Sequence, residues 1–104
     1  MDRKDVRRVL VGMPACRLTD MTMGHGCYPP QATIQGSNDV FIEGLPAHRV
    51  GDKIQPHCCY GCHPTTASKG SSTVFINGKG LMRVTDSASC GSKMMTGATT
   101  VKAG

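Results

Sequence analysis

Short apolar runs separated by Gly, Pro, Ser and Thr set the pattern of this chain. The clearest are Val40-Phe-Ile42 and Val74-Phe-Ile76, each preceded by a Gly-Ser pair and followed by Glu-Gly or Asn-Gly. Because Asn-Gly adopts positive φ at little cost, each run predicts a short strand that enters a tight turn and returns along the next residues. No stretch combines a 3.6-residue period with helix caps. We expect an all-β fold of short hairpins.

An internal repeat organises these hairpins. Three segments share a Gly, an Arg and an Asp at fixed offsets: 12–20, 44–52 and 78–86. Two of them follow the blocks 36–44 and 70–78, which are identical at six of nine positions. The first segment lacks such a block, but residues 97–101 copy the beginning of one. We therefore expect a closed, pseudo-threefold ring with a period of about 33 residues, in which the last segment lies beside the first unit.

Two sets of repeat positions are expected to be structural. The Asp of each Arg-x-x-Asp can close an Asx-type turn at a strand end, and the Arg can pair with a carboxylate or lie along the surface. Cys16, His48 and Met82 occupy one equivalent position, which indicates a packing site that tolerates several shapes. His48 is therefore left out of the candidate metal ligands.

Composition limits how such a fold can be stabilised. The 104 residues include two Phe, two Tyr and no Trp, so a metal, disulfides or a partner must support a small core. No apolar run exceeds three residues, and Val9-Leu-Val11 is far shorter than the roughly 20 residues of a membrane span and too short for a secretory signal. The formal charge of +5 is scattered and has no aromatic residues interleaved, which argues against a nucleic-acid groove.

Residues of the types that bind zinc recur at nearly the same position after each repeated unit. Counted from the Asp that ends each unit, His25 and His57 follow after five residues and Cys90 after four, and His63 lies six residues beyond His57. The four side chains could form a tetrahedral site with three nitrogen ligands and one sulfur ligand. Such a site has no open position for water, so we expect a structural metal.

The remaining cysteines leave alternatives open. Cys59 and Cys62 have the spacing of a zinc-knuckle pair and could displace one or two of the histidines, and Cys27 could add a thiolate. In a reducing compartment, six thiols favour metal ligands or buried small side chains. A disulfide among Cys27, Cys58, Cys59 and Cys62 is the alternative after release into an oxidising medium.

Together these motifs resemble the PAAR-repeat proteins over about residues 9–104. The resemblance rests on several stretches: Pro14-Ala-Cys-Arg17, Pro46-Ala-His-Arg49, Gly24-His-Gly with the following Pro29-Pro30, the two Gly-Ser-x-x-Val-Phe-Ile-x-Gly blocks, His57-Cys58, Cys62-His63 and Ser89-Cys-Gly91. No unit spells Pro-Ala-Ala-Arg, and the third, Gly80-Leu-Met-Arg83, lacks the proline. Such proteins form small β-rich cones that cap the trimeric spike of type VI secretion systems and contractile phage tails.

The resemblance implies a zinc ion near the apex of the cone, held by three histidines and one cysteine that match His25, His57, His63 and Cys90. It implies a tip without enzymatic activity that sharpens the spike and aids membrane puncture. The implied partner is a trimeric β-helical spike protein, of the valine-glycine-repeat type or a phage central spike, with one chain per trimer. Effector cargo is a further partner, no nucleic acid is expected, and the target membrane is contacted only during puncture.

Family members often carry fused toxin or adaptor domains. Here we expect a single PAAR-repeat domain over residues 1–104, with a short N-terminal tail at 1–8 and no fused effector domain. The protein would be made in the cytoplasm without a signal peptide, assembled at the tip of the apparatus, and delivered outside or into the target cell. Val40–Ile42 and Val74–Ile76, with residues 9–11 or Val101, are expected to form the base that meets the spike.

Two other classes of function are weaker. A zinc hydrolase would need an open coordination position and a nearby general base, and the four-ligand set offers neither. A small zinc-knuckle-like module for binding nucleic acid or protein would explain Cys59-x-x-Cys62 and the charge, but it would not explain three phased hairpins.

Overall fold

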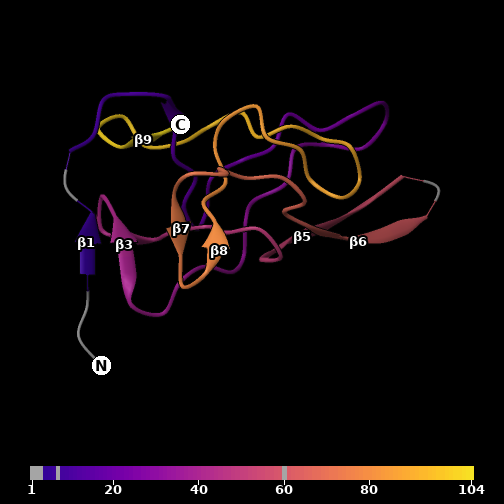
Figure 1. Cartoon of the computed structure of the whole chain (residues 1–104). Helices are drawn as coiled ribbons and strands as arrows, with labels where there is room; N and C mark the ends of the chain where they lie inside the picture. The colour runs from indigo at the N-terminus through magenta and orange to yellow at the C-terminus, as the bar shows by residue number, and fades with distance from the viewer. Residues whose placement is uncertain (1–3, 7, 60) are drawn as a thin grey trace.

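Nine short strands are assigned in a computed structural model that describes residues 4–6, 8–59 and 61–104 (Figure 1). In chain order they are β1 Lys4–Val6, β2 Met13–Pro14, β3 Val40–Ile42, β4 Leu45–Pro46, β5 Lys53–Cys58, β6 Cys62–Thr66, β7 Phe75–Ile76, β8 Lys79–Gly80 and β9 Lys102–Ala103. None of the described residues is helical, which confirms the expected all-β class. The described part accordingly holds no helix long and apolar enough to cross a membrane.

The two predicted hairpins are confirmed. β3 pairs antiparallel with β4, and β7 pairs antiparallel with β8. Their two-residue turns, Glu43-Gly44 and Asn77-Gly78, have positive φ at both positions, at 52° and 82° and at 55° and 79°. Such turns match the twist of short antiparallel strands. The return strands are shorter than the sequence suggested. Ala47 and Leu81, directly after them, still donate to Val40 and Val74 of their own hairpins, but their bridges are to Arg17 and Arg49 of other units.

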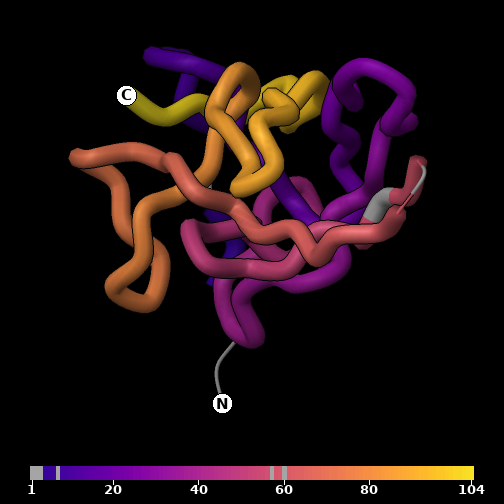
Figure 2. Tube along the Cα trace, turned by 90° about the vertical axis from the view of Figure 1, so that its right-hand side faces the viewer, coloured from indigo at the N-terminus to yellow at the C-terminus, as the bar shows by residue number. Residues whose placement is uncertain are grey.

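The predicted closure of the ring is also confirmed. β9 pairs antiparallel with β2 and thereby supplies the strand that the first unit lacks (Figure 2). The backbone N–H of Ala15 donates to the carbonyl of Val101 at 2.9 Å. Gly97 lies so close to this strand that a Cβ there would be 2.9 Å from the carbonyl oxygen of Ala15. A residue with any side chain would push the closing segment away from the first unit.

Three equivalent residues, Cys16, His48 and Met82, surround the pseudo-threefold axis, and we call them the axial ring. The N–H of Cys16 donates to the carbonyl of Met82, that of His48 to Cys16, and that of Met82 to His48, at 2.8, 3.0 and 3.0 Å. All three side chains are fully buried. The expected packing site is therefore confirmed, and the cyclic hydrogen bonds hold the three units at one level.

Each unit ends in the same turn, clamped by its Arg and Asp. In the second unit, the backbone N–H and the Nε of Arg49 donate to Oδ2 of Asp52, both at 2.8 Å, and Nη2 donates to Oδ1 at 2.9 Å. Equivalent contacts join the pairs Arg17–Asp20 and Arg83–Asp86. This confirms the structural role expected for Arg-x-x-Asp.

The N-terminal segment contributes more than the expected tail. β1 lies parallel to β3 in register with Val40–Ile42 and makes β3 the central strand of a three-stranded sheet. Strand pairing at this point covers an edge that would otherwise be open to other chains. The expected tail at 1–8 thus contains a paired strand.

The molecule is elongated, with principal extents of 42 × 28 × 21 Å. At one end the β5–β6 hairpin projects, as Figure 1 shows, and the N-terminal strand lies at the other. Two apolar clusters fill the wider part. From β5 and β6 only Ile54 belongs to either cluster among the described residues, so the projecting end of the hairpin has no apolar core.

The Arg–Asp clamp leads to a prediction on stability. Asp52 is fully buried, and burial alone would raise the pKa of its carboxyl, but the bonds from Arg49 outweigh that effect and lower it. Arg49→Met should therefore lower the free energy of unfolding by about 3 kcal/mol, because it leaves a buried carboxylate without its cation. Urea titration measures this. Arg8→Met, which removes the same charge from an exposed position, should change stability little; equal effects would contradict the structural role.

Buried His48 predicts acid sensitivity. Burial lowers the pKa of its imidazole below the ordinary 6.5. The bond between Nδ1 and the Gln35 carbonyl, at 2.7 Å, and the charges of Asp52 and Asp20 oppose this shift, whereas the charge of Arg49 adds to it. Below pH 6.5 the unfolded chain therefore binds a proton that the folded chain does not. Stability should fall as pH falls, by up to about 1.4 kcal/mol per pH unit.

His48→Met tests this prediction, because methionine occupies the equivalent position 82. Between pH 6.5 and 5, the free energy of unfolding should fall less in the variant than in the parent. Urea titration at each pH measures this. The other histidines contribute to both proteins alike. Parallel pH profiles would show that His48 is not the acid-sensitive group.

Candidate metal centre

Three of the predicted ligands converge at the narrow end of the molecule. The ligand atoms of His25, His63 and Cys90 all lie within 4.8 Å of one another. Each comes from a different segment: a loop of the first unit, strand β6, and a loop after the third unit. With Zn–N near 2.0 Å and Zn–S near 2.3 Å, tetrahedral zinc places its ligand atoms roughly 3.3–3.8 Å apart. Small side-chain movements would bring these three atoms to that geometry.

A tight turn presents His25. The N–H of His25 donates to the carbonyl of Tyr28 at 3.0 Å, and the N–H of Tyr28 donates back at 2.8 Å. Gly24, with φ of 77°, permits the turn, because a Cβ there would lie 2.6 Å from the Tyr28 carbonyl oxygen. The Tyr28 ring also contacts both histidines, with centroid distances of 4.9 Å to His25 and 4.7 Å to His63. Tyr28 thus holds the two imidazoles together.

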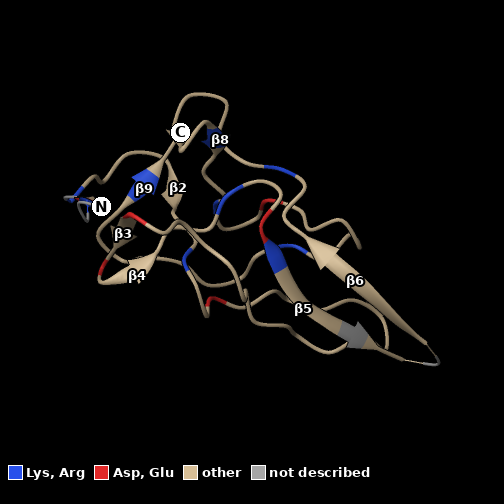
Figure 3. Cartoon of the chain, turned by 90° about the horizontal axis from the view of Figure 1, so that it is seen from below, with Lys and Arg blue, Asp and Glu red and all other residues tan. Residues whose placement is uncertain are grey.

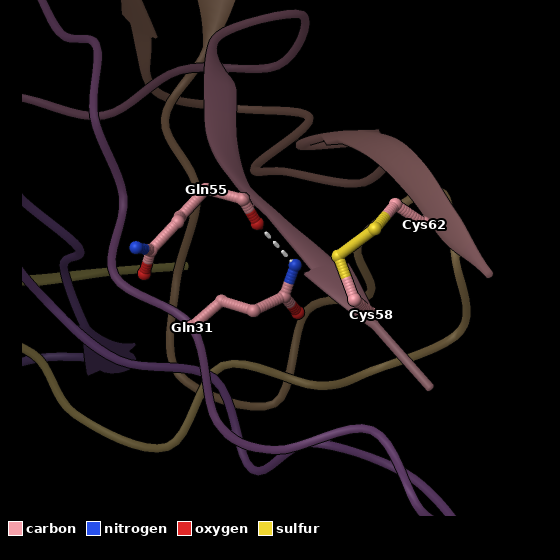
Figure 4. Close-up of a disulfide and its surroundings, with 4 residues drawn as sticks. All are labelled: Gln31, Gln55, Cys58 and Cys62. Atoms are coloured by element: carbon pink, nitrogen blue, oxygen red, sulfur yellow. Dashed lines mark hydrogen bonds between the residues drawn. A yellow bond between two sulfur atoms is a disulfide. The ribbon is translucent and has the colours of Figure 1, made fainter. Parts of the chain in front are cut away.

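A buried glutamine fixes the base of this loop against the hairpin (Figure 4). The side-chain amide of Gln31 donates to the Gln55 carbonyl of β5 and, at 3.2 Å, to Oγ1 of Thr65 on β6. Its backbone N–H donates to Oγ1 of Thr22 at 3.0 Å. The side chains of Gln31, Thr22 and Thr65 are buried. Sequence analysis missed these polar residues, because nothing in their spacing distinguishes them from ordinary loop residues.

Backbone bonds hold the loop of Cys90 beside β6. The N–H of Ser89 donates to the Thr66 carbonyl at 2.8 Å, and the N–H of Thr66 donates to Oγ of Ser89 at 3.0 Å. Within the loop, Ala88 donates to the carbonyl of Ser92 at 2.7 Å. The thiol of Cys90 is thereby placed next to the strand that carries His63.

The fourth predicted ligand, His57, stands in β5 with its backbone directly across from His63. Its side chain lies outside the part that the structure describes. His48 is not part of this group and belongs to the axial ring, as the sequence indicated. The described group contains no carboxylate, so its donor set consists of imidazole nitrogens and a thiol. Those are the ligands typical of zinc.

Four other cysteines form disulfides beside this centre. Cys27 is joined to Cys59, and Cys58 to Cys62, with Cα–Cα distances of 5.9 and 4.0 Å. Of the alternatives left open by the sequence, the structure therefore takes the disulfide, and Cys59 and Cys62 do not act as a zinc-knuckle pair. Cys16 and Cys90 remain as free thiols.

The segments around the centre carry no formal charge other than histidine. Residues 21–38, 54–68 and 87–92 contain no Asp, Glu, Lys or Arg. Figure 3 shows the consequence, because Lys, Arg, Asp and Glu colour the wider part while β6 carries none of them. Desolvation of this end would therefore cost less than desolvation of an ordinary protein surface.

Comparison with known proteins finds a family model and two relatives that are similar to part of this chain. The family model described as the PAAR motif matches residues 54–96, which include β5 after its first residue, β6 and Cys90. The chain is 32% identical over 71 residues to the NAD(P)(+) glycohydrolase toxin Tse6 of Pseudomonas aeruginosa and, to the same extent, to the (p)ppApp synthetase toxin Tas1 of P. aeruginosa strain UCBPP-PA14. Each alignment covers 62% of this chain.

The chain spans 16% of the length of these two toxins, so the similarity is to a small part of each. The matched motif, the three repeated units and the all-β ring agree with one another. Residues 54–96 of this chain thus match the PAAR-motif family.

Proposed function

We propose that this protein is the tip of a trimeric spike of a type VI secretion system or contractile phage tail. One observation carries the proposal: a pseudo-threefold PAAR fold converges at one end on His25, His63 and Cys90. Three equivalent units could each contact one subunit of a threefold partner. The loops that converge at the other end could form a pointed tip. Assembly would precede delivery outside or into a target cell, and the uncharged end supports a role in membrane puncture.

The apex is proposed to bind one structural zinc through His25, His57, His63 and Cys90. Since neither apolar cluster includes a described residue of the hairpin beyond Ile54, burial of the described side chains contributes little there. A closed metal site could supply on the order of 10 kcal/mol of apparent binding free energy, which becomes folding free energy. The chain itself would have no enzymatic activity, because four protein ligands leave no position for a reactive water.

The wide end is proposed to dock on the spike. Five large hydrophobic side chains are exposed on β2, on β7 or in residues 9–11, where Val9 bridges to Val101. They are Val9, Leu10, Val11, Met13 and Phe75. Such exposure favours a partner surface. Each pseudo-equivalent hairpin would meet one spike subunit, giving one chain per trimer. A possible effector cargo would be carried with the assembly.

Removing ligands tests the metal site. Elemental analysis of the purified protein should find one zinc per chain, and His63→Ala and Cys90→Ser should each lose most of it and lower the melting temperature. His48→Met is the matched control, because it changes a histidine that does not belong to the ligand group and should keep the zinc. A zinc-free parent protein, or ligand variants with full zinc content and unchanged melting, would refute the ligand set.

Charge placed on the base tests the partner. The chain mixed with its cognate spike should give a complex of one chain per three spike subunits by native mass spectrometry. Val11→Asp with Phe75→Asp should weaken this complex at least about tenfold, because two charges would be buried at the interface. Ile34→Asp changes an apolar residue beside β5 that is exposed to nearly the same extent as Phe75, and this variant should bind normally. A complex of three chains per trimer, or none, would contradict the proposal.

A further inference from the structure

We propose that the disulfides Cys27–Cys59 and Cys58–Cys62 are a redox-formed double staple that keeps the metal-binding apex assembled when its metal is lost. With the four thiols reduced, the metal would be the one strong link between the ligand segments beyond their hydrogen bonds and ring contacts. With them oxidised, two covalent links would hold the same segments. The inference rests on the metal centre proposed above, and it adds a second fastening whose state follows the surrounding medium.

Both staples are attached to the segments that carry the ligands. Cys27 lies two residues after His25, and its partner Cys59 follows β5. Cys62 directly precedes His63, and its partner Cys58 lies opposite it in the β5–β6 pairing. One link therefore joins the loop of the first unit to the hairpin, across a sequence separation of 32 residues. The other closes the end of the hairpin itself.

Contacts independent of the sulfurs bring these cysteines together. The Gln31 side chain bonds to the Gln55 carbonyl and the Thr65 hydroxyl, which fixes the base of the Cys27 loop against the hairpin. The β5–β6 pairing itself places Cys58 across from Cys62. Reduced thiols would therefore already lie near their partners, and this proximity favours the two observed pairings over the alternatives.

The six cysteines divide cleanly between three roles. Cys16 is fully buried in the axial ring, where its thiol donates to the Thr96 carbonyl at 3.6 Å. Burial raises the pKa of this thiol, so it forms little of the thiolate needed for exchange. Cys90 belongs to the metal group. Cys27, Cys58 and Cys62 are exposed and Cys59 is half-buried, so an oxidant can reach the staple cysteines.

Oxidation by a small-molecule disulfide such as oxidised glutathione balances as two exchange steps. The thiolate of one cysteine attacks the glutathione disulfide, forms a mixed disulfide and releases one glutathione thiolate. The partner cysteine then attacks the mixed disulfide and releases the second. Each staple loses two protons and two electrons, and one oxidised glutathione becomes two reduced molecules.

The physical effect of the staples falls on the open state of the apex. When the metal leaves, free loops gain conformational entropy and the ligands separate. Covalent links remove most of that freedom, because they close loops that would otherwise be open. The ligands of an oxidised apex therefore stay near one another and are ready to bind metal again.

The test uses the full chain loaded with zinc, kept in dithiothreitol or treated with oxidised glutathione. Peptide mapping should find Cys27–Cys59 and Cys58–Cys62 after oxidation. Hydrogen exchange is then measured in residues 24–30 and in β5 and β6, before and after removal of zinc with EDTA. In the reduced protein, EDTA should speed exchange there strongly. In the oxidised protein, exchange after EDTA should be at least about tenfold slower than in the reduced, zinc-free protein.

Matched variants assign the effect. Cys27→Ser with Cys59→Ser should abolish most of the protection given by oxidation, whereas Cys16→Ser should keep it. Free thiols or a different pairing after oxidation would overturn the proposal, and so would equal exchange in the oxidised and reduced zinc-free proteins. If EDTA changes nothing in the reduced protein, the proposed metal centre is wrong. The comparison of exchange in the zinc-free oxidised and reduced proteins still tests whether the disulfides stabilise the apex.

Discussion

The contact between Arg and Asp at the end of each unit is the constraint on which the rest of the structure depends. It turns the chain at the same phase in all three units, immediately after the residues of the axial ring. The turns need positive φ at their third residue, which is Gly51 in one unit and Thr19 and Thr85 in the others. Threonine tolerates that conformation poorly, so the ion pairs must hold it there. Because the three turns share one level, the loops that follow them leave in one direction and can meet.

That convergence creates the central difficulty of the fold. The wide part is closed by paired strands and two apolar clusters, but loops that meet at a point have too little interior to bury large side chains. Polar fastenings take over: the buried amide of Gln31, the rings of His25, Tyr28 and His63, two disulfides, and the proposed zinc. An apex built this way is narrow and uncharged, and it derives its order from specific bonds.

Much of this could be predicted from the repeat. Fixed offsets of Gly, Arg and Asp indicated three equivalent units, and the copy at 97–101 indicated that the chain closes on itself; the pairing of β2 with β9 confirms this. The phase of His25 and Cys90 relative to the Asp residues indicated that these side chains would meet. His63, six residues beyond the in-phase His57, was expected to join them, and the ligand atoms of the three lie close together. These inferences rest on turn-forming residues and on repetition, because both can be recognised directly from residue type and spacing.

Other features could not be obtained in that way. The pairing of Cys27 with Cys59 depends on how the first unit's loop lies against the hairpin, and spacing alone does not select it among the alternatives. The role of Gln31 depends on burial between two segments. β1 forms within the expected tail because the edge of β3 is available to it, which only the assembled ring provides.

X-ray absorption at the zinc K edge of the purified protein tests the central claim, a metal-held apex, most directly. The account predicts a four-coordinate spectrum with three nitrogen neighbours near 2.0 Å and one sulfur near 2.3 Å. A spectrum with two or more sulfur neighbours would assign the metal to the cysteines of the staples instead. A fifth oxygen neighbour would indicate an open site, and either result would contradict the account.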